Sequence, residues 1–139
     1  MNLDIRTEGL DKVLVDTSAW IEFFRKKEPY YSTILELVDN DLVCCIGIIL
    51  AELLQGAKSD KELDTLKEFL HVFDFLPESV KSWEKAGELS YTFKQKGKPL
   101  GLSDCYLAVL TRSNNVQLLT LDKHFDILKK EVDLKLYDL

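Results

Sequence analysis

Hydrophobic positions along the chain follow two alternating patterns. Short runs of consecutive apolar residues, such as Val13-Leu14-Val15 and Leu42-Val43-Cys44-Cys45, are typical of strands buried on both faces. Between them, apolar residues recur every three to four positions, which is the period of an amphipathic helix. The patterns predict strands at 12–15, 42–45, 72–76, 116–120 and 134–137, and helices at 18–25, 31–39, 48–56, 59–70, 79–96, 103–112 and 123–130.

Strands that alternate with helices predict an α/β domain, in which helices cover a mostly parallel sheet. The length of 139 residues suits one domain, and no repeat or linker divides the chain. Binding sites in such sheets form at the carboxyl ends of the strands. The residues that follow each strand are therefore the first candidates for chemistry.

The composition, 46% hydrophobic and 30% charged, is typical of a soluble globular domain. The longest apolar run, from Leu42 to Ala51, has ten residues, whereas a membrane span needs about 18–20. Residues 1–12 are polar and lack the apolar core of a signal peptide. We therefore expect a cytoplasmic protein without membrane association. The three cysteines lack the spacing of a zinc site, and we expect buried free thiols.

Acidic residues outnumber basic ones by 24 to 18, which gives a net charge of −6. This balance argues against a protein that coats nucleic acid, because such proteins usually present a basic surface. It does not exclude an enzyme that handles phosphates through metal ions, since some of the acids would then be metal ligands.

Four acidic residues stand in unusual places for surface charges. Asp16 ends the first predicted strand, and Asp122 follows the 116–120 strand. Asp104 lies in the first turn of a predicted helix, and Glu52 lies within an otherwise apolar helix. Taken singly, each aspartate is also explained as a turn residue or a helix cap. Glu52 is harder to explain, because buried charge needs a partner and no basic residue lies within four positions.

Four carboxylates brought together would repel one another, and some would protonate unless a divalent cation neutralised them. Oxygen ligands favour hard ions such as Mg²⁺ or Mn²⁺. Such ions activate water and stabilise the in-line displacement of a phosphoryl group. If the four acids converge in space, their chemistry fits a metal-dependent phosphodiesterase.

The segments around these acids resemble, in the same order, the four motifs of the PIN-domain nucleases. They are Leu14-Val15-Asp16-Thr17-Ser18-Ala19-Trp20-Ile21, Ala51-Glu52-Leu53-Leu54-Gln55-Gly56, Leu102-Ser103-Asp104-Cys105-Tyr106-Leu107-Ala108 and Leu118-Leu119-Thr120-Leu121-Asp122-Lys123-His124-Phe125. The resemblance covers residues 13–139 as a single domain. It implies a PIN-like, Rossmann-type three-layer α/β/α sandwich with a mostly parallel central sheet.

The size and the motifs are most similar to the toxins of VapBC-type toxin–antitoxin pairs. That resemblance implies an endoribonuclease that cleaves tRNA or rRNA by metal-activated water and inhibits translation. It also implies dependence on Mg²⁺ or Mn²⁺, a homodimer, and a cognate antitoxin that covers the active site. Carried over by position, the catalytic, metal-binding acids are Asp16, Glu52, Asp104 and Asp122, with Thr17 and Thr120 bonding the acids or the scissile phosphate.

The chain departs from the family in two places. Family members often have an acid immediately before the phenylalanine of the last motif, and here that position is His124. The resemblance therefore leaves open whether Asp122 binds a second metal or only positions water. Residues 1–12 precede the usual start of the family and form an N-terminal extension to which the sequence assigns no role.

Basic residues form small groups that could contact RNA. Arg25 and Lys26 end the first helix, and Lys94, Lys96 and Lys98 precede the Asp104 motif. If the acids converge, these groups would border the same cleft and contact phosphates. The alternative is a solvated surface with cations at helix C-termini.

Other functional classes fit the sequence less well. A haloacid-dehalogenase-like phosphatase needs a second acid two residues after the first, where this chain has Ser18. A phospho-receiver domain needs adjacent acids after its first strand, and none flank residues 13–15. Two alternatives stay open: a non-catalytic protein-binding module on this fold, and a PIN nuclease that acts in RNA processing outside a toxin–antitoxin pair.

Overall fold

The computed structural model describes residues 12–139, so nearly all of the expected extension at residues 1–12 lies outside it. Its strands are β1 (Val13–Val15), β2 (Val43–Cys45), β3 (Asp74–Phe75) and β4 (Gln117–Leu119). Its helices are α2 (Thr17–Phe24), α3 (Tyr30–Asp39), α4 (Gly47–Gln55), α5 (Asp60–Leu70), α6 (Val80–Gln95), α7 (Leu102–Ser113) and α8 (His124–Glu131). The predicted alternation of strands and helices is therefore confirmed.

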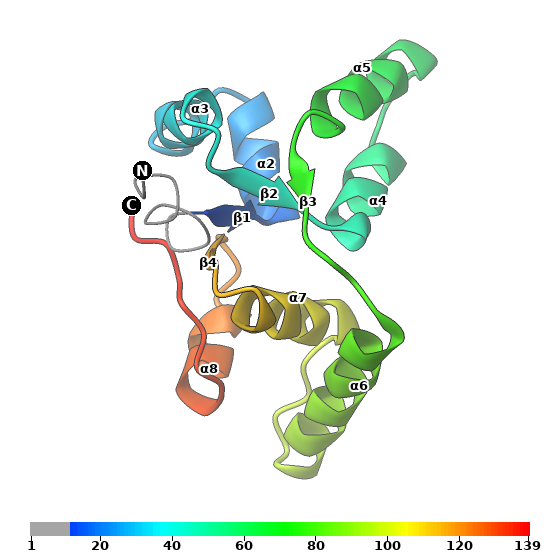
Figure 1. Ribbon diagram of the computed structural model, residues 1–139, viewed down its shortest axis with the longest axis vertical. Helices are drawn as coiled ribbons and strands as arrows, with labels where there is room; N and C mark the ends of the chain where they lie inside the picture. Colours follow the sequence, from blue (N-terminus) through cyan, green and yellow to red (C-terminus); the bar gives the residue numbers. More distant parts are fainter. Residues whose placement is uncertain (1–11) are drawn as a thin grey trace, which may run out of the picture.

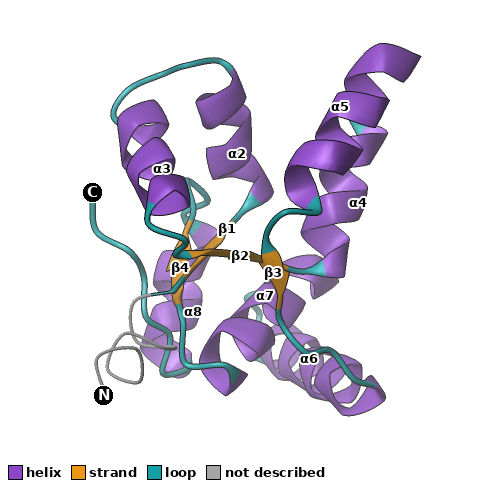
Figure 2. Cartoon of the chain, turned by 45° about the horizontal axis from the view of Figure 1, so that its top comes forward, coloured by secondary structure: helices purple, strands orange, loops and turns teal. Residues whose placement is uncertain are grey.

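The four strands form one parallel sheet in the order β3-β2-β1-β4. Helices α2, α3, α4 and α5 lie on one side of this sheet, and α6, α7 and α8 lie on the other (Figures 1 and 2). The predicted three-layer α/β/α sandwich is thus confirmed. All strands run in the same direction, so their carboxyl ends meet at one edge, where α2, α4 and the segment before α8 begin.

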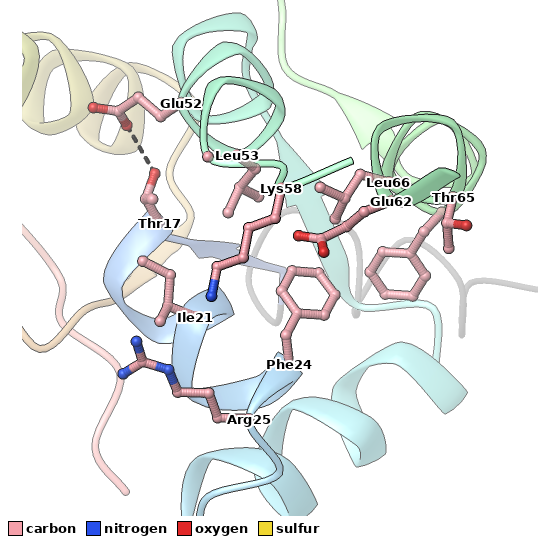
Figure 3. Close-up of a pocket in the computed structure, with 12 residues that line it drawn as sticks. Thr17, Ile21, Phe24, Arg25, Glu52, Leu53, Lys58, Glu62, Thr65 and Leu66 are labelled. Carbon is pink, nitrogen blue, oxygen red and sulfur yellow. Dashed lines mark hydrogen bonds between the residues drawn. The ribbon is translucent and has the colours of Figure 1, made fainter. Parts of the chain in front are cut away.

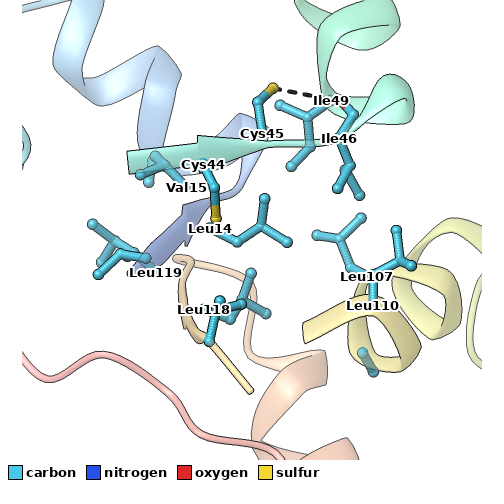
Figure 4. Close-up of a cluster of buried hydrophobic side chains, with 14 of the residues drawn as sticks. Leu14, Val15, Cys44, Cys45, Ile46, Ile49, Leu107, Leu110, Leu118 and Leu119 are labelled. Carbon is cyan, nitrogen blue, oxygen red and sulfur yellow. Dashed lines mark hydrogen bonds between the residues drawn. The ribbon is translucent and has the colours of Figure 1, made fainter. Parts of the chain in front are cut away.

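The central strands β1 and β2 are short and covered on both faces. All residues of β1 and β2 are buried, as the consecutive apolar runs predict. Leu14 is the register neighbour of both Cys44 and Leu118, so these three side chains face the same layer. There they meet apolar residues of α7, including Leu107 and Leu110 (Figure 4).

The three cysteines are free and buried, as expected. Burial raises the pKa of Cys44 to about 12 and that of Cys45 to about 11. Both thiols are therefore protonated at neutral pH and act as small apolar core residues.

The predicted last strand at 134–137 is wrong in extent. Only a single parallel bridge joins Leu136 to Leu118 of β4. Two backbone bonds support it, from Leu118 N to the Lys135 carbonyl at 2.9 Å and from Tyr137 N to the Leu118 carbonyl at 2.8 Å. β4 is only three residues long, so it offers few groups for pairing on this side. Among residues 12–139, no helix is long and apolar enough to cross a membrane.

Candidate active site

Asp16 occupies the junction between β1 and α2. Its backbone is extended, and its Oδ1 accepts a bond from Thr17 N at 2.7 Å, so the carboxylate caps the helix. Oδ2 accepts a bond from the Thr120 hydroxyl at 2.7 Å and a longer one from Ser18 at 3.3 Å. The residue is only 9% exposed. Burial raises the pKa of Asp16, while these hydrogen bonds oppose the rise.

Glu52 projects from the middle of α4 and is exposed, so the expectation that its helix buries it is wrong. The adjacent Ala51 is also exposed, because α4 buries only one side of its apolar sequence. The carboxylate Oε1 accepts a hydrogen bond from the Thr17 hydroxyl at 2.7 Å (Figure 3). Thr17 therefore contacts two predicted site acids, Asp16 through its backbone N–H and Glu52 through its side chain.

Asp104, Asp122 and His124 form a cluster at the same edge of the sheet. One ligand atom from each lies within 4.8 Å of the others. The Nδ1 atom of His124 lies 3.3 Å from Asp104 Oδ2 and 3.3 Å from Asp122 Oδ1. Asp122 Oδ1 also accepts a bond from His124 N at 2.9 Å, at the start of α8. Burial, and next the charge of Asp122, raise the pKa of Asp104.

Hydroxyl groups link this cluster to Asp16. The Thr120 hydroxyl that donates to Asp16 also accepts a bond from Asp122 N at 3.0 Å. The Ser18 hydroxyl accepts a bond from Leu121 N at 3.1 Å. These bonds fix the loop after β4 against the start of α2. The four acids predicted from the sequence therefore belong to one connected region.

The charges in this region act on one another. The negative charge of Glu52 contributes to the raised pKa of both Asp16 and Asp104. Within residues 12–139, His124 is the only basic residue whose side chain lies within 4 Å of the carboxylate oxygens of these acids. Such a set of oxygen atoms and one imidazole nitrogen suits a divalent cation, which would relieve the repulsion.

The model of the PIN domain family matches residues 13–131. This chain belongs to the PIN-domain family. It is 28% identical to Ribonuclease VapC1 of Methanocaldococcus jannaschii over 128 residues, which cover 91% of this chain and 88% of that protein.

Two solved structures resemble this PIN domain in fold. One is VapBC-1 from nontypeable Haemophilus influenzae, with a TM-score of 0.72, 24% identity, and coverage of 91% of this chain and 96% of that chain. The other is VapBC2 from Rickettsia felis bound to a DNA fragment from its promoter, with a TM-score of 0.71 and 23% identity. That match covers 91% of this chain and 98% of the other.

The basic residues expected near the PIN site differ in their contacts. Lys94, Lys96 and Lys98 are all exposed, and the Lys96 ammonium pairs with Glu131 at 2.9 Å. Arg25 is also exposed, and its guanidinium lies 3.9 Å from Glu22. Lys26 has a φ of 57° directly after α2, so its backbone helps to end that helix.

A pocket of about 590 Å³ opens beside Thr17 and Glu52. It lies between α2, α4 and α5, and Figure 3 shows Lys58 and Arg25 extending toward its Ile21 end. Apolar side chains form much of its wall. They are Ile21, Phe24, Leu53, Leu66 and Phe69.

Sequence reasoning did not select Ser18 or assign His124 a role, although both lie in the site. Ser18 is two residues after Asp16, where its hydroxyl reaches both the carboxylate and the loop after β4. The signal available in the sequence was its place inside the first PIN motif. In the sequence, His124 is recognisable only as a departure from the last motif. Its contacts with two acids depend on the fold and could not be predicted from the sequence.

Proposed function

We propose that this PIN domain is a Mg²⁺- or Mn²⁺-dependent endoribonuclease, and the toxin of a VapBC-type pair. Its substrate is tRNA or rRNA in the cytoplasm, and its cleavage inhibits translation. The observation that carries this proposal is the cluster of Asp104, Asp122 and His124, joined through hydroxyls to Asp16. The similarity to a protein named a ribonuclease supports the activity. The proposal includes residues 13–139 as one domain and a homodimer.

The residues present fit a divalent cation. Asp104, Asp122 and His124 would hold it, with Asp16 and Glu52 completing the acidic set. When bound, such an ion activates water and offsets the negative charge of the phosphodiester. The imidazole nitrogen of His124 favours Mn²⁺ over Mg²⁺, because Mg²⁺ prefers oxygen ligands.

The chain's own groups orient the acids. Thr17 donates its hydroxyl to Glu52 and its backbone N–H to Asp16. Thr120 fixes Asp16 and the backbone of Asp122 with one hydroxyl. Such bonds to ligating carboxylates keep them in place when substrate enters.

Cleavage of RNA by purified protein in Mn²⁺ tests the activity directly. We expect Asp104→Asn to lower the rate by more than about 100-fold, because removing even a group that only supports a metal ligand typically weakens metal sites 10- to 100-fold. The matched control is Asp126→Asn, an exposed acid in α8. Wild-type rates in Asp104→Asn, with chelator-resistant cleavage, would reject the metal-dependent nuclease. Tight partner binding without any cleavage would instead support the non-catalytic binding module.

The pocket beside the acids supports a cognate antitoxin as partner. Its apolar wall suits an apolar segment of another chain, and Thr17 and Glu52 at its border place that segment over the acidic site. The charged residues Arg25, Lys58 and Glu62 at the same pocket suit a segment of mixed charge.

The product of the neighbouring reading frame provides the test. We expect it to bind the chain and to inhibit RNA cleavage, and we expect Leu66→Glu to weaken both by at least about 10-fold, since a charge in an apolar pocket is costly. The control is Lys67→Glu, which places a glutamate on the exposed side of α5 and changes the net charge even more than Leu66→Glu does. Equal inhibition of wild type and Leu66→Glu would place the antitoxin elsewhere.

A further inference from the structure

Glu78 lies outside the acidic cluster, in the segment that crosses from β3 to α6. Its carboxylate makes two hydrogen bonds to different layers of the sandwich. Oε2 accepts the backbone N–H of Gly47 at 2.8 Å, and Oε1 accepts the hydroxyl of Tyr106. Gly47 is the first residue of α4, and Tyr106 lies in α7.

The bond to Gly47 serves a helix end that lacks its own cap. The residue before α4 is Ile46, which provides no side-chain hydrogen bond to the first turn. The Glu78 carboxylate takes this place from outside the helix, where the helix dipole favours a negative charge. The approach is close, because a Cβ atom at Gly47 would lie 3.3 Å from Glu78 Oε2. Glycine thus leaves room for the carboxylate at this position.

The second partner of Glu78, Tyr106, is held in place by packing. Tyr106 is fully buried, and its ring stacks on that of Trp83 in α6, with centroids 3.6 Å apart and planes 7° from parallel. Burial and the bond to Glu78 raise the pKa of the Tyr106 hydroxyl, so it stays protonated and donates at neutral pH. The donor is therefore fixed in position and in protonation state.

The two ends of this link lead to two of the site acids. Glu52 lies in α4, which begins at Gly47, and Asp104 lies in α7, two residues before Tyr106. Helices α4 and α7 are on opposite sides of the sheet (Figures 1 and 2). Among residues 12–139, the Glu78 carboxylate is the only group that hydrogen-bonds to both of these helices.

We propose that Glu78 is a positioning residue of the acidic site: by joining Gly47 to Tyr106, it sets where Glu52 stands relative to Asp104. This inference rests on the proposed metal-dependent function. Glu78 contacts neither the clustered acids nor His124 directly, so it acts through the two helices rather than as a ligand. Loss of the link moves Glu52 with α4 and weakens metal binding without removing any acid.

Tyr106→Phe is the sharpest variant, because it removes only the hydroxyl and keeps the ring stacked on Trp83. The matched control is Tyr91→Phe, which removes an exposed hydroxyl from α6. We measure the dissociation constant for Mn²⁺ by electron paramagnetic resonance, together with kcat and KM for RNA cleavage. We expect Tyr106→Phe to weaken Mn²⁺ binding about 10-fold, the lower end of the range for groups that support metal ligands. We expect kcat to fall with KM unchanged, and Tyr91→Phe to match wild type.

A double-mutant cycle separates positioning from general destabilisation. If the link acts through Glu52, Tyr106→Phe has little further effect on Mn²⁺ affinity in a Glu52→Gln background. Additive losses would overturn the proposal, and so would wild-type Mn²⁺ affinity in Tyr106→Phe. Glu78→Gln, which keeps one acceptor oxygen, should lose less affinity than Glu78→Ala. Failure of the proposed function is a different result, since wild type itself would then bind no Mn²⁺ and cut no RNA.

Discussion

Asp16 and Asp104 have the same side chain, and burial raises the pKa of both, yet the protein holds them in different ways. Asp16 is buried, and three donors, Thr17, Ser18 and Thr120, bond its carboxylate. The Asp104 side chain is 23% exposed, and its neighbours are His124 and a second carboxylate, Asp122. The Asp16 half of the site is thus organised by neutral hydrogen bonds that need no ion. The Asp104 half contains facing negative charges that a cation would stabilise.

The largest expected difference between the two halves of the site is in Mn²⁺ affinity. We expect His124→Ala to weaken Mn²⁺ binding by more than about 100-fold, because it removes the nitrogen that lies between two carboxylates. Thr120→Val removes a hydroxyl that bonds Asp16 and the backbone N–H of Asp122 but does not itself ligate the ion, so we expect a loss of about 10-fold. Isothermal titration calorimetry at pH 7.5 gives both constants. A larger loss in Thr120→Val than in His124→Ala would contradict a metal site centred on His124.

Without metal, variants of the two halves should also differ in thermal stability, by a smaller amount. Asp104→Asn removes a charge that faces Asp122, and we expect the Tm in EDTA at neutral pH to rise by about 3 °C. Asp16→Asn leaves a buried amide N–H₂ facing hydroxyl donors, and we expect its Tm to fall by a similar amount. Differential scanning calorimetry measures both, with Asp126→Asn as the exposed control.

The sign of the pH dependence follows from the raised pKa of Asp104. A carboxyl whose pKa is higher in the folded than in the unfolded state stabilises the fold when protonated, and that contribution is lost as the pH rises through the folded pKa. The stabilising effect of Asp104→Asn should therefore shrink as the metal-free protein is acidified toward pH 4. A constant difference between variant and wild type from pH 7 to pH 4 would contradict the assigned repulsion.

The sequence patterns locate the acids well because their positions depend on local rules. Each predicted strand end or helix start is an element boundary that nearby apolar spacing defines, and parallel strands bring such boundaries to one edge. Asp16 and Asp122 could be placed at that edge for this reason. The exposure of Glu52 could not be predicted, because α4 is apolar at most of its other positions and only tertiary packing decides which side is covered.

Contacts between distant segments were beyond the reach of sequence reasoning. Glu78 reads as an ordinary acid after Pro77, and its two partners are 31 and 28 positions away. Trp83 is 41% exposed while it stacks on Tyr106. Such pairings depend on how α6 and α7 cross, which hydrophobic periodicity does not specify.

The smallest expected effects concern which half of the site faces RNA. Lys94 lies at the end of α6, in the segment that leads to Asp104, whereas Arg25 ends the helix that Asp16 begins. We expect Lys94→Ala to lower the salt dependence of RNA binding by about 0.7 in log–log slope, the value for one phosphate contact on a single strand. Binding is measured in EDTA, so that no cleavage occurs.

Lys96→Ala should change the slope less, because Glu131 already pairs with Lys96. An equal change in Arg25→Ala would show that RNA spans both halves, whereas unchanged slopes in all three variants would reject phosphate contacts at these residues.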